Sequence, residues 1–267
     1  AHIASCMAEN NLDEEVIGVG FDGTGYGDDN NIWGSEFFVC NLKEYTRINH
    51  FDYMPMPGSD KVTDEPWRMA VSYLYKIYGN NLLELDLPFL KNINQSSVEL
   101  LCNAIDKEIN CPMTSSAGRL FDAVAALINL CPYSKFHAEA PMRLESIIEN
   151  KISQSYSCSI SKTISFNETI EQIVRDLKRH VPLPEISAKF HNTVIFVIYE
   201  VVKKIRDGYN LNKVVLSGGT FQNKYLYENL ENILTNDDFE VFSNQKVPTN
   251  DGGIALGQLV IAAKKYL

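Results

Sequence analysis

Two short apolar runs that end in glycine constrain the fold most. Residues 16–21 (VIGVGF) and the stretch NKVVLSGG at 212–219 are too short for buried helices and are rich in β-branched residues, so each predicts a buried strand. Around the second run the chain alternates helix, strand and helix, with helices expected at 185–206, 220–234 and 254–267. This alternation is typical of α/β layers.

The first run carries a glycine pattern that matches a dinucleotide fingerprint letter for letter. The pattern GxGxxG runs from Gly18 to Gly23, but the fingerprint requires a helix directly after the glycines. Here the glycine-rich stretch 22–31 and a second strand pattern at 32–40 follow instead. We therefore predict a β-hairpin with its turn at 22–31, whose backbone approaches a phosphate or a metal; a solvated surface hairpin is the alternative. Asp22 is the candidate ligand because its carboxylate lies where the backbone bends.

The remaining periodicity predicts mainly helices. The segment AHIASCMAEN reads as a helix from its first residue with no capping residue before it, which suggests a fragment of a longer protein. A polar, serine-rich segment at 150–168 predicts a loop or a small β excursion. Further helices are expected at 65–79, 95–109 and 115–130, and a short strand at 239–244.

Charge and cysteine usage exclude several classes of protein. Acidic residues number 34 against 24 basic ones, a formal charge of −10, which argues against a nucleic-acid partner because neutralising phosphates needs a basic surface. The six cysteines form no CxxC pair, so neither a zinc ribbon nor a disulfide framework is expected. We therefore expect the protein to lie in a reducing cytoplasm. No apolar run approaches the roughly 20 residues of a membrane span, and the first residues do not resemble a signal peptide.

Two constellations suggest a nucleotide site. In the helix at 115–130, Gly118 lies one turn before Asp122, on the stripe opposite the apolar face. A glycine beside a carboxylate would give a sugar ring a flat surface to pack on and one hydrogen-bond acceptor. An ordinary helix with a solvated aspartate is the alternative. In the second, a buried strand runs into Gly218 and Gly219 before a helix begins, so exposed amides can bind an anion. Asn223 falls in that helix's first turn and could reach a base or ribose; a tight strand–helix connection is the alternative.

The third constellation precedes the last helix. Asp251 is followed by two glycines, so it is either a helix N-cap or a carboxylate with room beside it for a metal or phosphate. His2 is the only histidine near a motif, and a metal-binding HxxxH pair would need a histidine four residues before it, a position outside this chain. His191 lies on the predicted helix at 185–206 and is interpreted as a satisfied, partly buried histidine.

Taken together, these stretches resemble the C-terminal part of the HypF family, the carbamoyltransferases of nickel–iron hydrogenase maturation. One departure is the segment 136–139, Phe-His-Ala-Glu, where the family usually has Tyr-Glu-Gly-Gln. The matching stretches keep the family's order and cover nearly the whole chain: AHIASCMAEN, FDGTGYG, PGSDKVTDEPWRMA, SSAGRLFDAVAAL, APMRLE, FHNT, LSGGTFQN and DGGIALGQ.

The resemblance implies a two-lobed α/β fold of the actin and sugar-kinase type (ASKHA), shared with tRNA threonylcarbamoyl transferases. Residues 1–267 would form the C-terminal portion of a carbamoyl-transfer domain with an incomplete first lobe, without the family's upstream acylphosphatase, zinc-finger and adenylate-forming domains. It implies that His2, Asp22 and Asp251 bind a divalent metal, with iron or zinc favoured. It also implies nucleotide-binding residues, namely Gly23, Thr24, Gly25, Gly118, Asp122, Gly218, Gly219 and Asn223.

The activity that the resemblance implies is transfer of a carbamoyl group from carbamoyl-adenylate to the C-terminal cysteine of HypE, in the synthesis of the hydrogenase's cyanide ligands. HypE and an adenine nucleotide are then the expected partners. A tRNA threonylcarbamoyl transferase is one alternative, and a truncated module that binds nucleotide or partner without turnover is another. A sheet that lacks part of a lobe would also expose an edge to which a second copy can pair.

Overall fold

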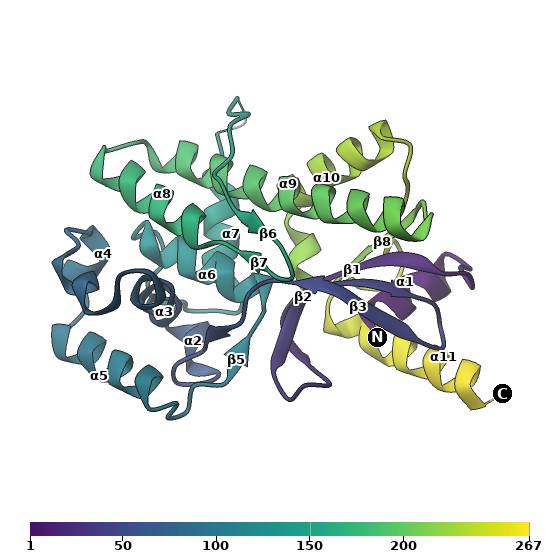
Figure 1. Ribbon diagram of the computed structural model, residues 1–267, viewed down its shortest axis with the longest axis horizontal. Coiled ribbons are helices and arrows are strands. Elements are labelled where there is room, and N and C mark those ends of the chain that lie inside the picture. The colour runs from purple at the N-terminus through teal and green to yellow at the C-terminus, as the bar shows by residue number, and fades with distance from the viewer. Residues whose placement is uncertain (150, 267) are drawn as a thin grey trace.

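A mixed sheet of seven strands organises the molecule, in a computed structural model that describes residues 1–149 and 151–266 (Figure 1). The strand order is β4-β5-β2-β1-β8-β9, with β3 also paired to β2, while β6 and β7 form a separate hairpin. The strands of the large sheet are β1 (Val16–Tyr26), β2 (Ile32–Cys40), β3 (Tyr45–His50), β4 (Met54–Pro55), β5 (Met113–Thr114), β8 (Lys213–Ser217) and β9 (Glu240–Ser243). The small hairpin consists of β6 (Ser159–Ile160) and β7 (Ile164–Ser165).

Helices surround this sheet. They are α1 (His2–Glu9), α2 (Lys61–Asp64), α3 (Trp67–Tyr78), α4 (Pro88–Lys91), α5 (Gln95–Asp106), α6 (Ala117–Leu127), α7 (Glu139–Ser146), α8 (Asn167–Lys178), α9 (Leu183–Tyr209), α10 (Lys224–Asn236) and α11 (Ile254–Tyr266). Short 3-10 helices span Gly79–Glu84, Gly219–Gln222 and Asp251–Gly253. The loop predicted from 150 and the helix predicted through 267 each include one residue outside the described ones.

The central strands are covered on both faces, which explains their continuous apolar runs. Neighbouring residues of β1 point to opposite faces, so Ile17 joins the main core with α6 and α9, whereas Val16 joins a smaller core under α1. Val214 and Val215 of β8 divide between the two cores in the same way. In Figure 1, α9 runs along one side of the sheet, while α1 and α11 lie on the other.

The mixed α/β class predicted from the alternation of elements is confirmed. The predicted second strand, β2, follows the GxGxxG match, in place of the helix that a dinucleotide fingerprint would require. The predicted hairpin turn was too long, however. β1 continues through the glycines to Tyr26, and Gly25 pairs with Trp33 after a register shift between Phe21 and Gly25. The strand therefore bends at Asp22 without ending there, as an irregular strand does at a bulge.

The helix predicted at 115–130 has a different environment from the one expected. α6 is buried on nearly every side, so Asp122 on the supposed open stripe is only 2% exposed. A helical wheel shows one helix alone and cannot show that α3 and α7 pack on the second face. The long helix α9 also continues through Gly208 and ends at Tyr209, where the capping residue Asn210 has a left-handed φ of 56°.

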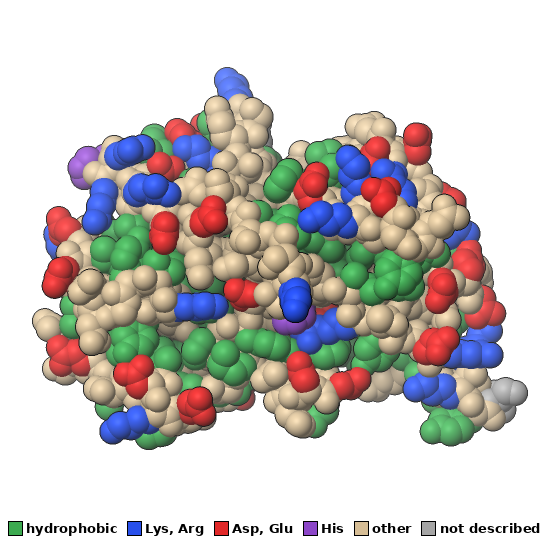
Figure 2. Space-filling model, in the orientation of Figure 1, with side chains coloured by type: hydrophobic (Ala, Val, Ile, Leu, Met, Phe, Trp, Pro, Cys, Tyr) green, Lys and Arg blue, Asp and Glu red, His purple; other side chains and the backbone are tan. Residues whose placement is uncertain are grey.

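The surface carries charges of both signs. Acidic and basic side chains are interspersed over the face in Figure 2. Within the described residues, no helix combines the length and the apolar character that crossing a bilayer requires.

Candidate functional site

Close backbone contacts bring distant segments together around the bend of β1 at Asp22. Gly218, with a φ of 111°, lies so near β1 that an added Cβ would be 2.1 Å from the Phe21 carbonyl oxygen. A Cβ on Gly118 would lie 3.0 Å from the Gly23 Cα, which brings the N-terminus of α6 against the same strand. β1 and β8 are parallel neighbours, so their carboxyl ends meet at one edge of the sheet. Glycine is needed at these positions because any side chain would separate the segments.

A cavity of about 600 Å³ opens between these segments. Five of the eight residues predicted to bind a nucleotide line it, namely Gly23, Thr24, Gly118, Gly219 and Asn223. Two of the three predicted metal ligands, Asp22 and Asp251, line it as well. A nucleotide-sized ligand fits such a volume.

The other three predicted nucleotide residues lie behind this lining. Gly25 pairs with Trp33 in the hairpin, and Gly218 packs its backbone against Phe21, next to the bend of β1. Asp122, on α6, is buried by the helices that pack around it. Their roles toward a nucleotide stay predictions.

The three residues predicted as metal ligands converge beside the cavity. The Nε2 atom of His2 lies 3.1 Å from Asp22 Oδ2 and 3.8 Å from Asp251 Oδ1. One ligand atom from each residue lies within 4.8 Å of the other two. Segments at opposite ends of the sequence thus meet here: α1 supplies the imidazole, β1 one carboxylate, and the turn before α11 the other.

The geometry of this trio fits a divalent cation. Ligand atoms about 2 Å from a zinc or iron ion are separated by roughly 3 to 4 Å from one another, as the His2 contacts are. One imidazole and two carboxylates suit iron, zinc or manganese. Burial alone would raise the pKa of Asp22, but hydrogen bonds from His2 and from the backbone of Gly23 and Gly219 hold it below its ordinary value. Asp22 is therefore ionised at neutral pH, as a metal ligand would have to be.

Asp251 and Asn223, which were predicted at the N-termini of two helices, are placed differently from the expectation. Asn250, and not Asp251, caps the turn before α11, because its Oδ1 accepts from Gly252 N at 3.1 Å. Asp251 is consequently free of the capping role, and its side chain is 81% exposed. Asn223 is the N-cap of α10 and precedes its first turn, with Oδ1 accepting from Leu226 N at 2.8 Å.

Sequence reasoning missed a buried cation in the cavity lining. Arg119 is 7% exposed, and its Nη2 pairs with Asp122 Oδ2 at 2.8 Å. The same Nη2 would lie 3.8 Å from a Cβ added at Gly23, so the guanidinium lies beside the bend of β1. Burial raises the pKa of Asp122 to about 6, and the charge of Arg119 opposes that rise. The signal was available, since an arginine directly after Gly118 must lie in the first turn of α6.

Other missed lining residues come from two segments. One is the departure from the family pattern at 136–139, which contributes His137 and Ala138, the latter with a left-handed φ of 59°. The second is α7, where Glu145 Oε1 accepts from the backbone nitrogens of Lys224 and Tyr225 and so supports the start of α10.

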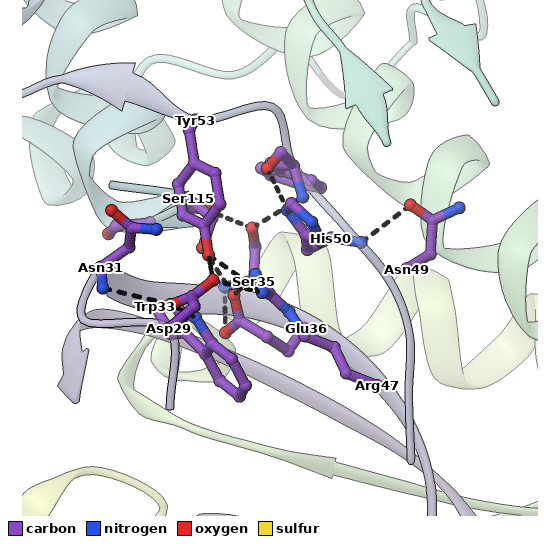
Figure 3. Close-up of polar contacts among 12 residues, drawn as sticks. Asp29, Asn31, Trp33, Ser35, Glu36, Arg47, Asn49, His50, Tyr53 and Ser115 are labelled. Carbon is purple, nitrogen blue, oxygen red and sulfur yellow. Dashed lines mark hydrogen bonds and ion pairs between the residues drawn. The ribbon is translucent and has the colours of Figure 1, made fainter. Parts of the chain in front are cut away.

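A polar cluster that includes the buried side chains of Ser35, Glu36 and Ser115 lies at the hairpin of β1 and β2 (Figure 3). Glu36 accepts hydrogen bonds from Ser115 Oγ at 2.6 Å and from Arg47 Nη2 at 3.1 Å. The next residue, Ser116, caps α6, and its Oγ lies 2.9 Å and 2.8 Å from the carbonyl oxygens of Asp22 and Gly23. These hydrogen bonds, together with the peptide bond between Ser115 and Ser116, thus connect Arg47 to the backbone that carries Asp22.

The chain is similar to known proteins along nearly its whole length. Residues 18–258 match the family described as "Carbamoyltransferase, Kae1-like Domain, second subdomain". The chain is 30% identical to a probable carbamoyltransferase HypF of Methanocaldococcus jannaschii over 97% of its length, and 30% identical to the carbamoyltransferase HypF of Synechocystis over all of it. A crystal structure of full-length HypF in the phosphate- and nucleotide-bound form superimposes with a TM-score of 0.93 and 44% identity over 98% of the chain.

These relatives are much longer than the chain. It covers 34% of the M. jannaschii protein, 37% of the Synechocystis protein and 41% of the crystallised HypF. The chain therefore spans little more than a third of the length of these relatives. The family resemblance that the sequence motifs suggested is confirmed by these matches.

Proposed function

The chain belongs to the HypF family of carbamoyltransferases, and we propose on that premise that it performs carbamoyl transfer from carbamoyl-adenylate to a cysteine thiol of HypE. The observation that carries the proposal is the meeting of the His2, Asp22 and Asp251 cluster with a glycine-lined cavity of nucleotide size. A two-lobed fold of the actin and sugar-kinase type, of which residues 1–267 form the C-terminal portion, belongs to the same proposal. The HypF relatives support hydrogenase maturation over tRNA modification.

The transfer step requires a thiolate from outside the chain. Its sulfur attacks the carbamoyl carbon, a carbon–sulfur bond forms, and the bond from that carbon to the phosphate oxygen breaks, so that AMP leaves with the electron pair. Burial raises the pKa of all six cysteines of the chain, to about 12 for Cys6 and Cys40. Thiols with such pKa values are poor nucleophiles near pH 7, which supports a partner's cysteine as the acceptor.

The residues of the cavity supply positioning and charge. Gly23, Gly118 and Gly219 let the backbone approach the nucleotide, and the Gly219 amide, whose nitrogen lies 3.2 Å from Asp22 Oδ1, orients that carboxylate. Arg119 provides a positive charge beside Gly23 for the phosphate of the leaving AMP. His2, Asp22 and Asp251 would hold the divalent metal, which when bound supplies Lewis-acid charge to the carbamoyl oxygen or to the phosphate.

Asp251→Ala in the full-length enzyme tests the proposal. We expect the variant to form no thiocarboxamide on HypE, which mass spectrometry of HypE would measure. Adenylate formation should be retained, because that step belongs to another domain. Asp207→Ala removes a comparably exposed carboxylate on α9 as a matched control and should leave both steps unchanged. Unchanged transfer in Asp251→Ala would remove the metal assignment. Nucleotide binding without thiocarboxamide in the unaltered enzyme would instead favour a non-catalytic binding module.

A further inference from the structure

His191 is a completely buried histidine that contacts the nucleotide cavity through Asn223. It lies on α9, is 0% exposed, and packs edge-on against Phe121, Phe190 and Tyr225. Its two ring nitrogens each have a close polar partner. Nδ1 lies 2.8 Å from the carbonyl oxygen of Ser187, and Nε2 lies 2.9 Å from Nδ2 of Asn223.

The hydrogen bonds around Asn223 allow only one arrangement of protons. The Leu226 N–H is a donor and lies 2.8 Å from Asn223 Oδ1, so the capping bond fixes the amide with its oxygen toward α10. The amide nitrogen, which only donates, therefore faces His191 Nε2, and that ring nitrogen must accept. The Ser187 carbonyl can only accept, so Nδ1 carries the proton. Burial lowers the pKa of His191 to about 4, in keeping with this neutral ring.

This arrangement determines what Asn223 can offer a ligand. One N–H of its amide is used by His191, and one lone pair of its oxygen is used by Leu226. Asn223 lines the cavity and is 9% exposed. The second N–H has no partner among these contacts. A flipped amide would oppose two donors at the helix cap and would leave the imidazole without its donor, so both partners maintain the same orientation.

We propose that His191 is a positioning residue, which holds Asn223 as a hydrogen-bond donor to an acceptor atom of the bound nucleotide. The inference rests on the proposed nucleotide binding and adds which residue sets the polarity of that contact. Asn223 lies directly after the 219–222 turn and at the start of α10. By fixing Asn223, His191 also links the cavity to α9, where Ser187 Oγ donates to the Leu144 carbonyl of α7 at 2.6 Å.

Binding of AMP to the full chain, measured by isothermal titration calorimetry, tests this inference. His191→Leu should weaken AMP binding about tenfold, because the Asn223 amide loses its buried acceptor and its orientation. His191→Gln carries one acceptor and one donor and should restore most of the affinity. Val197→Ala is the matched control, since it removes packing from another fully buried position of α9 without removing a hydrogen bond. It should lower thermal stability and leave the AMP affinity unchanged.

A second readout does not depend on the nucleotide. Imidazole ¹⁵N shifts of His191 should report the neutral ring with its proton on Nδ1 from about pH 5 to pH 8; Tyr225 is the titratable side chain whose ring packs against it. A proton on Nε2, or AMP affinity unchanged in a folded His191→Leu protein, would overturn the inference alone. An unaltered chain that binds no AMP would overturn the nucleotide role of Asn223 and the proposed function together.

Discussion

Replacing Glu36 by glutamine should change how the stability of the protein depends on pH. Glu36 is 3% exposed and lies in the cluster of Figure 3, where Ser115 Oγ, Ser35 N and Arg47 Nη2 lie 2.6, 2.8 and 3.1 Å from its oxygens. Burial raises its pKa to about 7, although these hydrogen bonds and the charge of Arg47 oppose the rise. The folded protein therefore retains a proton on this side chain at pH values where the unfolded chain has lost it.

The size and sign of the effect follow from proton linkage. The pKa rises from 4.5 to about 7, and each pH unit corresponds to about 1.4 kcal/mol. Because the folded state binds the proton more tightly, the contribution of Glu36 to stability is greatest below pH 4.5 and is lost as the pH rises through 7. The total loss from this group is on the order of 3 kcal/mol. The glutamine of Glu36→Gln cannot titrate, so this variant does not lose stability in this way. Its amide nitrogen would face one of the donors, which lowers the free energy of unfolding by about 1 to 2 kcal/mol at every pH.

Urea unfolding at several pH values between about 4.5 and 8 measures the difference. The free energy of unfolding of the unaltered protein minus that of Glu36→Gln should decrease by about 3 kcal/mol across this range. Glu44→Gln, at an exposed position of the β2–β3 connection, serves as the control and should show a constant difference. A constant difference for Glu36→Gln as well would refute the reasoning, because it would show that burial does not raise this pKa.

Three further predictions concern the cavity. Asp22→Asn should weaken Zn²⁺ binding by about 100-fold or more, since it removes a carboxylate ligand, and calorimetric titration with Zn²⁺ would show this; equal affinity would contradict the ligand role. Gly118→Val should lower the free energy of unfolding in urea by about 1 to 3 kcal/mol and weaken AMP binding, because its Cβ would lie 3.0 Å from the Gly23 Cα. Unchanged AMP affinity would show that this contact does not shape the site. Ala138→Gly should stabilise the protein by about 0.5 to 1 kcal/mol in the same assay, because Ala138 has a φ of 59°; a loss of stability would contradict the strain.

The sequence predicted those features that depend on neighbours along the chain. Strand patterns at 16–21 and 212–219 and the helices around the second one are read from local periodicity, and the structure has them. The convergence of His2 with Asp22 and Asp251 was expected only through the family resemblance, because no spacing rule joins residues at opposite ends of a chain. The structure does bring the three together.

Features that depend on tertiary contacts were not predictable in this way. Glycine in a sequence signals freedom to turn, but Gly25 remains in β1 because Trp33 lies opposite it in the paired strand. Asp122 looked solvated on a helical wheel, whereas neighbouring helices bury it beside Arg119. Asn223 looked free to reach a ligand, whereas His191, on another helix, takes one of its donors.

The position of the metal-ligand cluster follows from the parallel pairing of β1 with β8. Parallel strands end at the same edge, so Asp22, where β1 bends, meets Gly219, which follows β8, and Gly219 N lies 3.2 Å from Asp22 Oδ1. The chain that leads to Asp251 is attached at the same edge, because Gly218 N donates to the Thr249 carbonyl at 3.0 Å. The backbone of Gly218 and Gly219 thus positions both carboxylates: Asp22 directly, and Asp251 through the chain that Thr249 anchors. A change in the Gly218–Gly219 backbone must therefore move the cluster of His2, Asp22 and Asp251 together with the glycine-lined cavity. The proposed transfer between a nucleotide and an external thiol would need both to keep a fixed relative position.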